Sequence, residues 1–172
     1  KFTECYRHLP YPRNLYAAMV STVDERIGKV LELLENKNLL GDTLLIYMSD
    51  NGHSEESYQE WGEEYGAHGG GGYTGEWTGC KNTFYEGGIR VPAIISLPGL
   101  VPSDEVRDQI ITNMDFFPTI LEILNLPRPA PALDGHSLLP ILRDSKAPSA
   151  YSELIFQWQE SWCVRRDEWK LI

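Results

Sequence analysis

Two short segments of this sequence carry residue types that suggest chemistry at a charged centre. In the first, Asp50 and Asn51 directly follow an apolar run and are themselves followed by Gly52. A carboxylate beside a carboxamide offers the hard oxygen ligands that calcium and magnesium prefer. Asn-Gly is also the strongest two-residue hairpin signal, so a tight turn is the alternative interpretation. Residues 54–57 make a poor returning strand, which weakens that alternative without removing it.

The second segment, residues 79–92, places a lysine, a glycine pair and an arginine ahead of another apolar run. In most settings Lys81 would be an ordinary surface lysine, but a compact ammonium charge suits an oxyanion. The Gly87-Gly88 pair gives the backbone conformations that are closed to other residues and lets a ligand approach closely. We therefore expect Lys81 to bind an anionic ester.

The long segment between these motifs holds two histidines. His53 and His68 could each donate a proton to a leaving alkoxide, or could simply face solvent. Residues 50–80 show little periodicity, and a loop of that length is usually functional or mobile. Glycines 69–72 are expected to form a flexible lid. Four aromatic residues could face a sugar or aryl ring, or could pin the loop to the core: Trp61, Tyr65, Tyr73 and Trp77.

The apolar pattern around the motifs predicts the elements that position them. From residue 12 to about 36, apolar residues recur at three- and four-residue steps, as in a long amphipathic helix. Residues 43–49 and 91–97 are short apolar runs typical of strands covered on both faces. A helix feeding such a strand suggests a parallel α/β sheet. A second amphipathic helix is expected over 113–125.

The last part of the chain reads differently. Prolines between 127 and 131 predict a boundary between a domain over residues 1–126 and a linker with a small β subdomain over 127–172. Residues 138–142 are expected to form a short helical turn. Apolar and polar residues alternate towards the end, from 154 to 172, which is typical of an antiparallel ribbon.

Composition narrows the class of protein. The chain has 172 residues and a net charge of -10, enough length for one domain with a core. The negative charge repels nucleic acid and anionic membranes, and no apolar run approaches bilayer length, so neither partner is expected. The three cysteines form neither a zinc pattern nor an evident disulfide framework: Cys5, Cys80 and Cys163.

Together these motifs resemble those of sulfatases of the alkaline phosphatase-like superfamily, over nearly the whole chain. Residues 49–53 resemble the family's metal turn, and residues 79–92 resemble its lysine and Glu-Gly-Gly-X-Arg-Val-Pro segment, the most specific signal. The resemblance implies an α/β fold. The chain would hold part of an alkaline phosphatase-like sandwich and the start of a small antiparallel C-terminal subdomain.

The resemblance also implies roles for individual residues. Asp50 and Asn51 would ligate calcium, Lys81 would bind the sulfate oxygens, and His53 would line the pocket as a catalytic and substrate-binding residue. The substrate would be a sulfated small molecule or carbohydrate. Asp115 and Asp134 match landmarks of the family that look structural.

The sequence departs from the family at the nucleophile. Such sulfatases use a formylglycine made from Cys or Ser in a Cys/Ser-X-Pro/Ala-X-Arg motif, and none of the three cysteines begins one. Ser103 and Arg107 have the right spacing but lack the central small residue. We expect the formylglycine and the other metal ligands in a missing N-terminal part, and no appreciable turnover by this chain alone.

Two other functions stay open. Related folds hydrolyse phosphate or phosphonate esters, and a truncated chain could bind an anion or a partner without catalysis. An open sheet edge and an uncovered apolar face suggest that the chain pairs with a second copy or with the missing N-terminal half. Enzymes of this family are often exported, which is compatible with a periplasmic or secreted location.

Overall fold

The computed structural model describes residues 1–54 and 72–172. By its contacts the chain divides into two compact units, Lys1–Ile95 and Ser96–Ile172, called unit 1 and unit 2 below. This division by contacts falls earlier in the chain than the domain boundary expected at 126/127, which stays a prediction.

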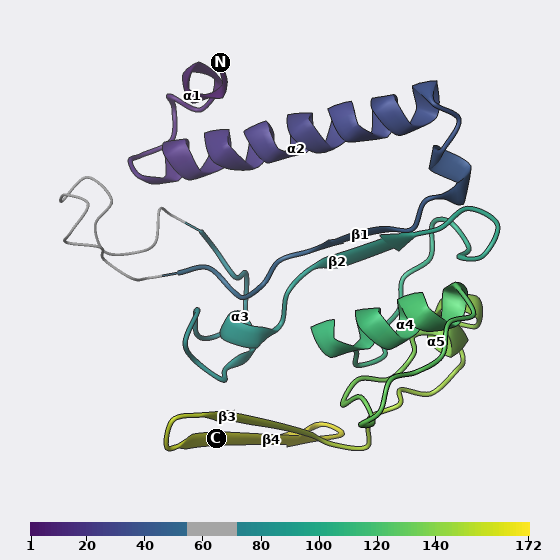
Figure 1. The fold of residues 1–172 in the computed structure, drawn as a ribbon. Helices are drawn as coiled ribbons and strands as arrows, with labels where there is room; N and C mark the ends of the chain where they lie inside the picture. Colours follow the sequence, from purple (N-terminus) through teal and green to yellow (C-terminus); the bar gives the residue numbers. More distant parts are fainter. Residues whose placement is uncertain (55–71) are drawn as a thin grey trace. The chain divides into compact units, whose positions relative to one another are not determined.

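Unit 1 begins with two helices, α1 (Phe2–Cys5) and α2 (Arg13–Asn36) (Figure 1). Helix α2 confirms the amphipathic helix predicted from residue 12 to about 36. The hydroxyl groups of Tyr6 and Ser21 lie 2.7 Å apart and tie the start of the chain to α2. A 3-10 turn, η1 (Leu40–Asp42), then leads into the first strand.

The apolar stripe of α2 is largely bare within the described part of the chain. Ala18 is its buried residue, whereas Met19 and Val30 are 66% and 54% exposed. Most helical stability in proteins comes from packing such a stripe against a core. The stripe therefore marks a surface that the described residues do not cover.

The two predicted strands form one two-stranded sheet, from β1 (Leu45–Met48) and β2 (Ala93–Ser96). Just beyond them, the N–H of Ser49 donates to the carbonyl of Pro92, and the N–H of Gly52 donates to the carbonyl of Gly88. As the residue number rises from 49 to 52 on one segment, the number of its partner falls from 92 to 88 on the other, which is the pattern of an antiparallel pair. The parallel arrangement expected from the sequence is therefore wrong for this pair.

The physical reason lies in the connection. Parallel strands need a crossover, usually a helix of some length, and the described parts of the connection between β1 and β2 hold only the short helix α3 (Glu86–Ile89). The antiparallel pairing also decides where the motifs meet. The carboxyl end of β1 and the amino end of β2 lie side by side, with α3 next to them (Figure 1). A parallel pair would have put these two ends at opposite edges.

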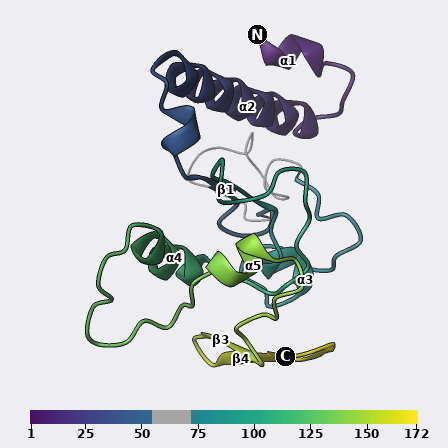
Figure 2. The same cartoon turned by 90° about the vertical axis from the view of Figure 1, so that its right-hand side faces the viewer.

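Unit 2 contains the other predicted helices (Figure 2). Turn η5 (Asn113–Asp115) and helix α4 (Phe116–Ile123) confirm the helix expected over 113–125, and α5 (Leu139–Arg143) confirms the helical turn expected at 138–142. Arg107, from the Ser103 pattern, donates through Nε to the carbonyl of Ile141 at 2.8 Å, which helps to hold α5. The buried apolar residues of this unit lie mostly on these helices: Leu121, Leu138, Leu139, Ile141 and Leu142.

A fully buried carboxylate, Asp115, ties unit 2 together. It accepts hydrogen bonds from the N–H of Thr112 at 2.7 Å and from the N–H of His136 at 2.8 Å. The hydroxyl of Tyr151 donates to the same carboxylate. Burial, and then this hydrogen bond, raise the pKa of the Tyr151 hydroxyl. The structural role expected for the Asp115 landmark fits this network, whereas the other landmark, Asp134, is an exposed residue.

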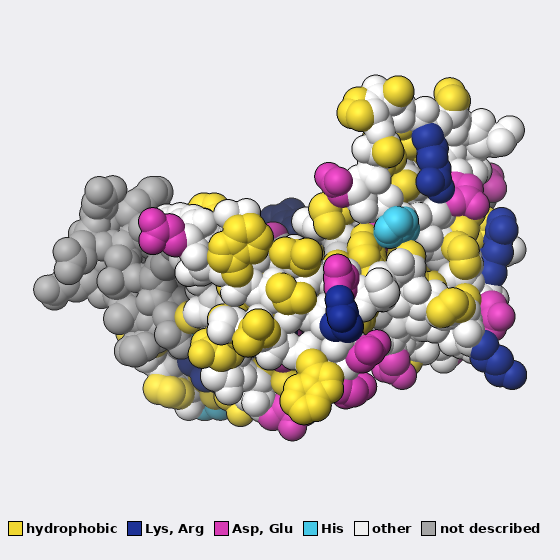
Figure 3. Space-filling view, turned by 90° about the horizontal axis from the view of Figure 1, so that it is seen from below, with side chains coloured by type: hydrophobic (Ala, Val, Ile, Leu, Met, Phe, Trp, Pro, Cys, Tyr) yellow, Lys and Arg dark blue, Asp and Glu magenta, His cyan; other side chains and the backbone are white. Residues whose placement is uncertain are grey.

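The end of the chain forms an antiparallel sheet in the order β3-β4-β5, as predicted. Its strands are β3 (Leu154–Trp158), β4 (Ser161–Arg166) and β5 (Trp169–Leu171). Ile155, Val164 and Leu171 are in register across it, and Ile155 and Leu171 are 59% and 75% exposed. Figure 3 shows exposed apolar side chains among carboxylates on the face that it presents. Among the described residues, no helix combines the length and apolar character needed to cross a bilayer.

Candidate functional site

The turn after β1 presents two oxygen-bearing side chains. Asp50 is exposed and Asn51 is half-buried. The N–H of Asn51 donates to Oδ1 of Asp50 at 2.9 Å, and its Nδ2 donates to the carbonyl of Gly52 at 2.9 Å. The turn therefore offers a carboxylate and an amide oxygen at the end of the strand.

This turn is not a two-residue hairpin. A type I′ hairpin needs a positive φ at both central residues, and neither Asn51 nor Gly52 is among the described residues with positive φ. The N–H of Gly52 pairs with Gly88, far along the chain, rather than with an immediately returning strand. The hairpin alternative left open by the sequence is therefore wrong.

The segment that carries Lys81 lies directly against this turn. The N–H of Lys81 donates to the carbonyl of His53 at 2.9 Å, and the N–H of Gly52 donates to Gly88 at 2.9 Å. The side chains of His53 and Lys81 belong to half-buried residues. Asp50, Asn51, His53 and Lys81 thus lie on two backbone segments that are hydrogen-bonded to each other.

Sequence reasoning missed the residue that holds the turn around Lys81. The Thr83 hydroxyl donates to the carbonyl of Cys80 at 2.7 Å and accepts from the N–H of Cys80 at 3.2 Å. Asn82, between them, has a φ of 70°, a left-handed conformation in which asparagine is enriched among non-glycine residues. The signal in the sequence was Asn82 followed by Thr83, both typical of turns.

Short helix α3 was also missed. Its four residues include the Gly87-Gly88 pair, which disfavours a helix on propensity. Arg90 lies 3.8 Å from the carboxylate of Glu86, an i,i+4 pair that supports one helical turn. The i,i+4 spacing of Glu86 and Arg90 was the signal in the sequence that could have predicted this helical turn.

Two aromatic residues near this segment, Tyr73 and Trp77, make cation–π contacts with arginines. The guanidinium of Arg90 lies 4.3 Å from the centre of the Trp77 ring, and that of Arg13 lies 5.8 Å from the centre of the Tyr73 ring. Tyr73 is 74% exposed and Trp77 is 38% exposed. Neither ring is buried in a core. The predictions for Trp61, Tyr65, His68 and the start of the lid at 69–71 fall outside the described residues.

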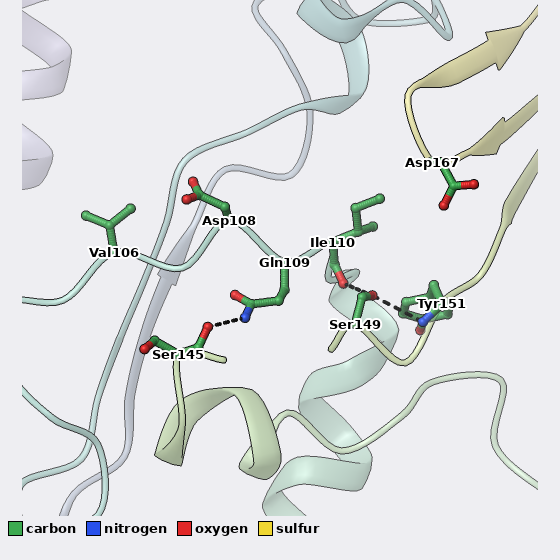
Figure 4. Close-up of a pocket in the computed structure, with 8 residues that line it drawn as sticks. All are labelled: Val106, Asp108, Gln109, Ile110, Ser145, Ser149, Tyr151 and Asp167. Carbon is green, nitrogen blue, oxygen red and sulfur yellow. Dashed lines mark hydrogen bonds between the residues drawn. The ribbon is translucent and has the colours of Figure 1, made fainter. Parts of the chain in front are cut away.

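A cavity of about 550 Å³ lies elsewhere, in unit 2 (Figure 4). Asp108 and Asp167 contribute carboxylates to its wall, and none of the described residues that line it is a lysine or an arginine. Figure 4 shows Gln109 directed at the carbonyl of Ser145, to which it donates at 2.7 Å. An acidic wall repels a sulfate ester, and Asp50, Asn51, His53 and Lys81 do not line this cavity. We therefore place the candidate site at the end of β1.

The donor chemistry of this turn fits part of a calcium site. Calcium takes six to eight oxygen ligands, and Asp50 and Asn51 supply hard oxygens of the right kind. Within residues 1–54 and 72–172, no group of three or more His, Cys, Asp or Glu side chains is arranged to hold a metal ion. A complete shell would need ligands beyond this turn.

The comparisons with known proteins agree with the motifs. Residues 2–126 match the family model described as Sulfatase. Human steryl-sulfatase is 33% identical over 145 residues, which are 84% of this chain and 24% of that protein. Human N-acetylgalactosamine-6-sulfatase is 37% identical over 131 residues, which are 76% of this chain and 23% of that protein. This chain belongs to the sulfatase family and spans about a quarter of the length of these relatives.

Solved structures support the fold. The PsFucS1 sulfatase from Pseudoalteromonas sp. superposes with a TM-score of 0.75 at 25% identity, over 90% of this chain and 29% of that chain. A crystal structure of Ps i-CgsB in complex with k-i-k-neocarrahexaose gives a TM-score of 0.78 at 24% identity, over 94% of this chain and 34% of that chain. The chain thus has part of the alkaline phosphatase-like fold of sulfatases.

Proposed function

We propose that this chain supplies the cation-binding turn and the sulfate-binding lysine of an enzyme that hydrolyses sulfate esters. The observation that carries the proposal is the backbone contact between residues 50–53 and the segment around Lys81, in a chain of the sulfatase family. Sulfated small molecules or carbohydrates are the proposed substrates. The names steryl-sulfatase and N-acetylgalactosamine-6-sulfatase, which two relatives carry, support both kinds.

Each residue has a proposed task. The ammonium group of Lys81 attracts the sulfate oxygens and stabilises the negative charge that grows on them in the transition state. The imidazole of His53 donates a proton to the leaving oxygen. Asp50 and Asn51 would be part of the shell of a divalent cation, calcium by family resemblance. When bound, that cation would act as a Lewis acid on the sulfate group.

The nucleophile has no counterpart in these 172 residues, since the sequence holds no Cys/Ser-X-Pro/Ala-X-Arg motif. Without a nucleophile the covalent route is closed. We therefore propose that this chain alone has no appreciable turnover. The formylglycine and the remaining cation ligands would come from other parts of the sulfatase domain.

The binding half of the proposal is testable on the chain itself. Amide chemical shifts of isotope-labelled chain are followed while inorganic sulfate, and separately calcium, is added. We expect sulfate to shift the amide of Lys81, and calcium to shift the amides of Asp50 and Asn51. Lys81→Ala should weaken sulfate binding about tenfold or more, the size of a lost charge-assisted hydrogen bond. The exposed Lys37→Ala, from the same unit, is the matched control.

Three results would count against the proposal. Sulfate binding that is unchanged in Lys81→Ala removes the role of the lysine. Phosphate binding that is stronger than sulfate binding at the same amides favours a phosphate ester hydrolase. Turnover of an aryl sulfate by the isolated chain with calcium, if it survives repurification, contradicts the proposed inactivity of the chain alone.

A further inference from the structure

The contact between the two site segments depends on glycines. A Cβ on Gly52 would overlap the carbonyl oxygen of Gly87 and lie 2.7 Å from its carbonyl carbon and 3.0 Å from Cα of Gly88. On the other side, a Cβ on Gly87 would overlap the carbonyl oxygen of Gly79 and lie 2.8 Å from that of Thr78. The backbone around Gly87 is therefore sandwiched between two other backbone segments, with no room for a side chain at either contact.

Hydrogen bonds join these layers in the same place. The N–H of Gly87 donates to the carbonyl of Thr78 at 2.8 Å. The N–H of Gly52 donates to the carbonyl of Gly88, and the N–H of Lys81 donates to the carbonyl of His53. All three bonds run between backbone groups. They fix the distance between the turn and the lysine segment, and no side chain of Asp50 or Asn51 takes part in them.

We infer that Gly52 and Gly87 are positioning residues, which set the spacing between the oxygen donors at 50 and 51 and the ammonium group of Lys81. This inference rests on the proposed function, because it assigns the spacing to the joint binding of a cation and a sulfate group. A side chain at Gly52 pushes the turn away from Gly87 and Gly88, and a side chain at Gly87 pushes α3 away from residues 78 and 79, which lead directly to Lys81. The ligating side chains remain in the chain, but they no longer face one common ligand.

A positioning role differs from a structural role in what it changes. If the glycines only stabilise the fold, Gly→Ala variants lose stability and bind both ions normally while they are folded. If the glycines position the site, calcium no longer raises the affinity for sulfate in the folded variants. In the wild type, saturating calcium should tighten sulfate binding about fivefold or more, within the usual range of coupling between sites. In Gly52→Ala and Gly87→Ala this factor should fall towards one.

The experiment uses the 172-residue chain and four variants. Gly52→Ala and Gly87→Ala introduce the clashes. Gly28→Ala, in α2, is the control, because nothing lies within 4 Å of its added Cβ. Gly75→Ala controls for backbone strain alone, since Gly75 has a φ of 67° and open space around it. Sulfate affinity is measured from the amide shift of Lys81, with and without saturating calcium, below the melting temperature of each variant.

A second measurement needs no variant. Hydrogen exchange in the wild-type chain should protect the amides of Gly52, Lys81 and Gly87 as strongly as those of β1 and β2, although all three lie outside the strands. If these amides exchange as fast as exposed turns, the inference is overturned. It is also overturned if Gly52→Ala and Gly87→Ala fold and keep the wild-type coupling factor, or if Gly28→Ala lowers that factor equally.

Failure of the proposed function gives a different pattern. Calcium and sulfate then leave the amides of Asp50, Asn51 and Lys81 unshifted in the wild type. In that case the positioning role is overturned together with the proposed function, and slow exchange of the three amides shows only that the backbone contact itself is stable. If the wild type binds both ions but the glycine variants keep the wild-type coupling factor, the positioning role alone is overturned.

Discussion

In unit 1, backbone groups join the segments that meet at the end of β1, whereas in unit 2 one buried side chain joins the segments around α4. Gly52 and Gly87 let main chains touch directly. Asp115 instead accepts hydrogen bonds from Thr112, His136 and Tyr151. In unit 1 the carboxylate of Asp50 stays at the surface. In unit 2 the carboxylate of Asp115 is buried and accepts the hydrogen bonds that join the segments. The difference teaches that whether a polar residue ends up exposed or buried as a structural acceptor depends on the groups that close the turn beside it.

The largest expected effect comes from removing the side-chain anchor. Asp115→Ala leaves two backbone N–H groups and one hydroxyl without their acceptor beside the fully buried position 115. An unsatisfied buried group costs about 1–3 kcal/mol and these three donors are partly buried, so we expect about 3 kcal/mol of lost stability. Urea unfolding followed at the amides of unit 2 measures it. Asp134→Ala, at an exposed position, is the control, and an equal loss in both variants would contradict the role of the anchor.

A smaller effect is expected from alkaline pH. The pKa of Tyr151 is raised in the folded state by burial and by the bond to Asp115. The folded state therefore holds this proton more tightly than the unfolded state. The associated stability is complete below the unfolded pKa of about 10 and is lost as the pH rises through the folded pKa. Tyr151→Phe removes this titration.

The measurement for Tyr151 is the difference in unfolding free energy between wild type and Tyr151→Phe at several values of pH. At neutral pH we expect the unfolding free energy of the wild type to exceed that of Tyr151→Phe by about 1 kcal/mol, the value of the lost hydrogen bond. Above pH 10 we expect this difference to shrink. Other tyrosines and lysines titrate in both proteins and cancel in this difference. A difference that stays constant up to pH 12 would show that the bond to Asp115 does not control the hydroxyl proton.

The smallest effect is expected at the exposed aromatic residue of unit 1. The Arg90 guanidinium over Trp77 is worth about 0.5–1 kcal/mol at such a site. Arg90→Gln removes the charge and leaves the ring in place, so it should lower the stability of unit 1 by about that amount, whereas Arg90→Lys, which keeps a cation, should recover part of it. Thermal unfolding measures both variants. A loss of several kcal/mol in Arg90→Gln would mean that Arg90 stabilises unit 1 through more than its contact with Trp77.

Two apolar surfaces of the described chain are exposed, one on α2 and one on the C-terminal sheet. The stripe of α2 and the row formed by Ile155 and Leu171 are exposed in the described chain. The chain spans about a quarter of the relatives it matches. Uncovered faces of this kind are sites of association or aggregation. The pairing expected from the sequence, with a second copy or with another part of the domain, stays a prediction.

Local pattern predicted most of the longer helices and strands, because the spacing of apolar residues is a local property. It predicted α2, β1, β2, α4, α5 and the antiparallel ribbon. It failed for α3, where two glycines hide a single helical turn. It also failed for the direction of the β1–β2 pair, because strand pairing depends on how the chain returns from residue 54 to residue 79.

The sequence by itself determined which residue types could hold a cation and a sulfate group, since the chemistry of Asp50, Asn51 and Lys81 does not depend on the fold. Only the tertiary structure decided that their segments meet, because an antiparallel pairing and the absence of side chains at Gly52 and Gly87 bring distant backbones into contact. It also decided that Asp115 is structural. Burial, which no local pattern specifies for a single carboxylate, makes its hydrogen bonds count towards stability.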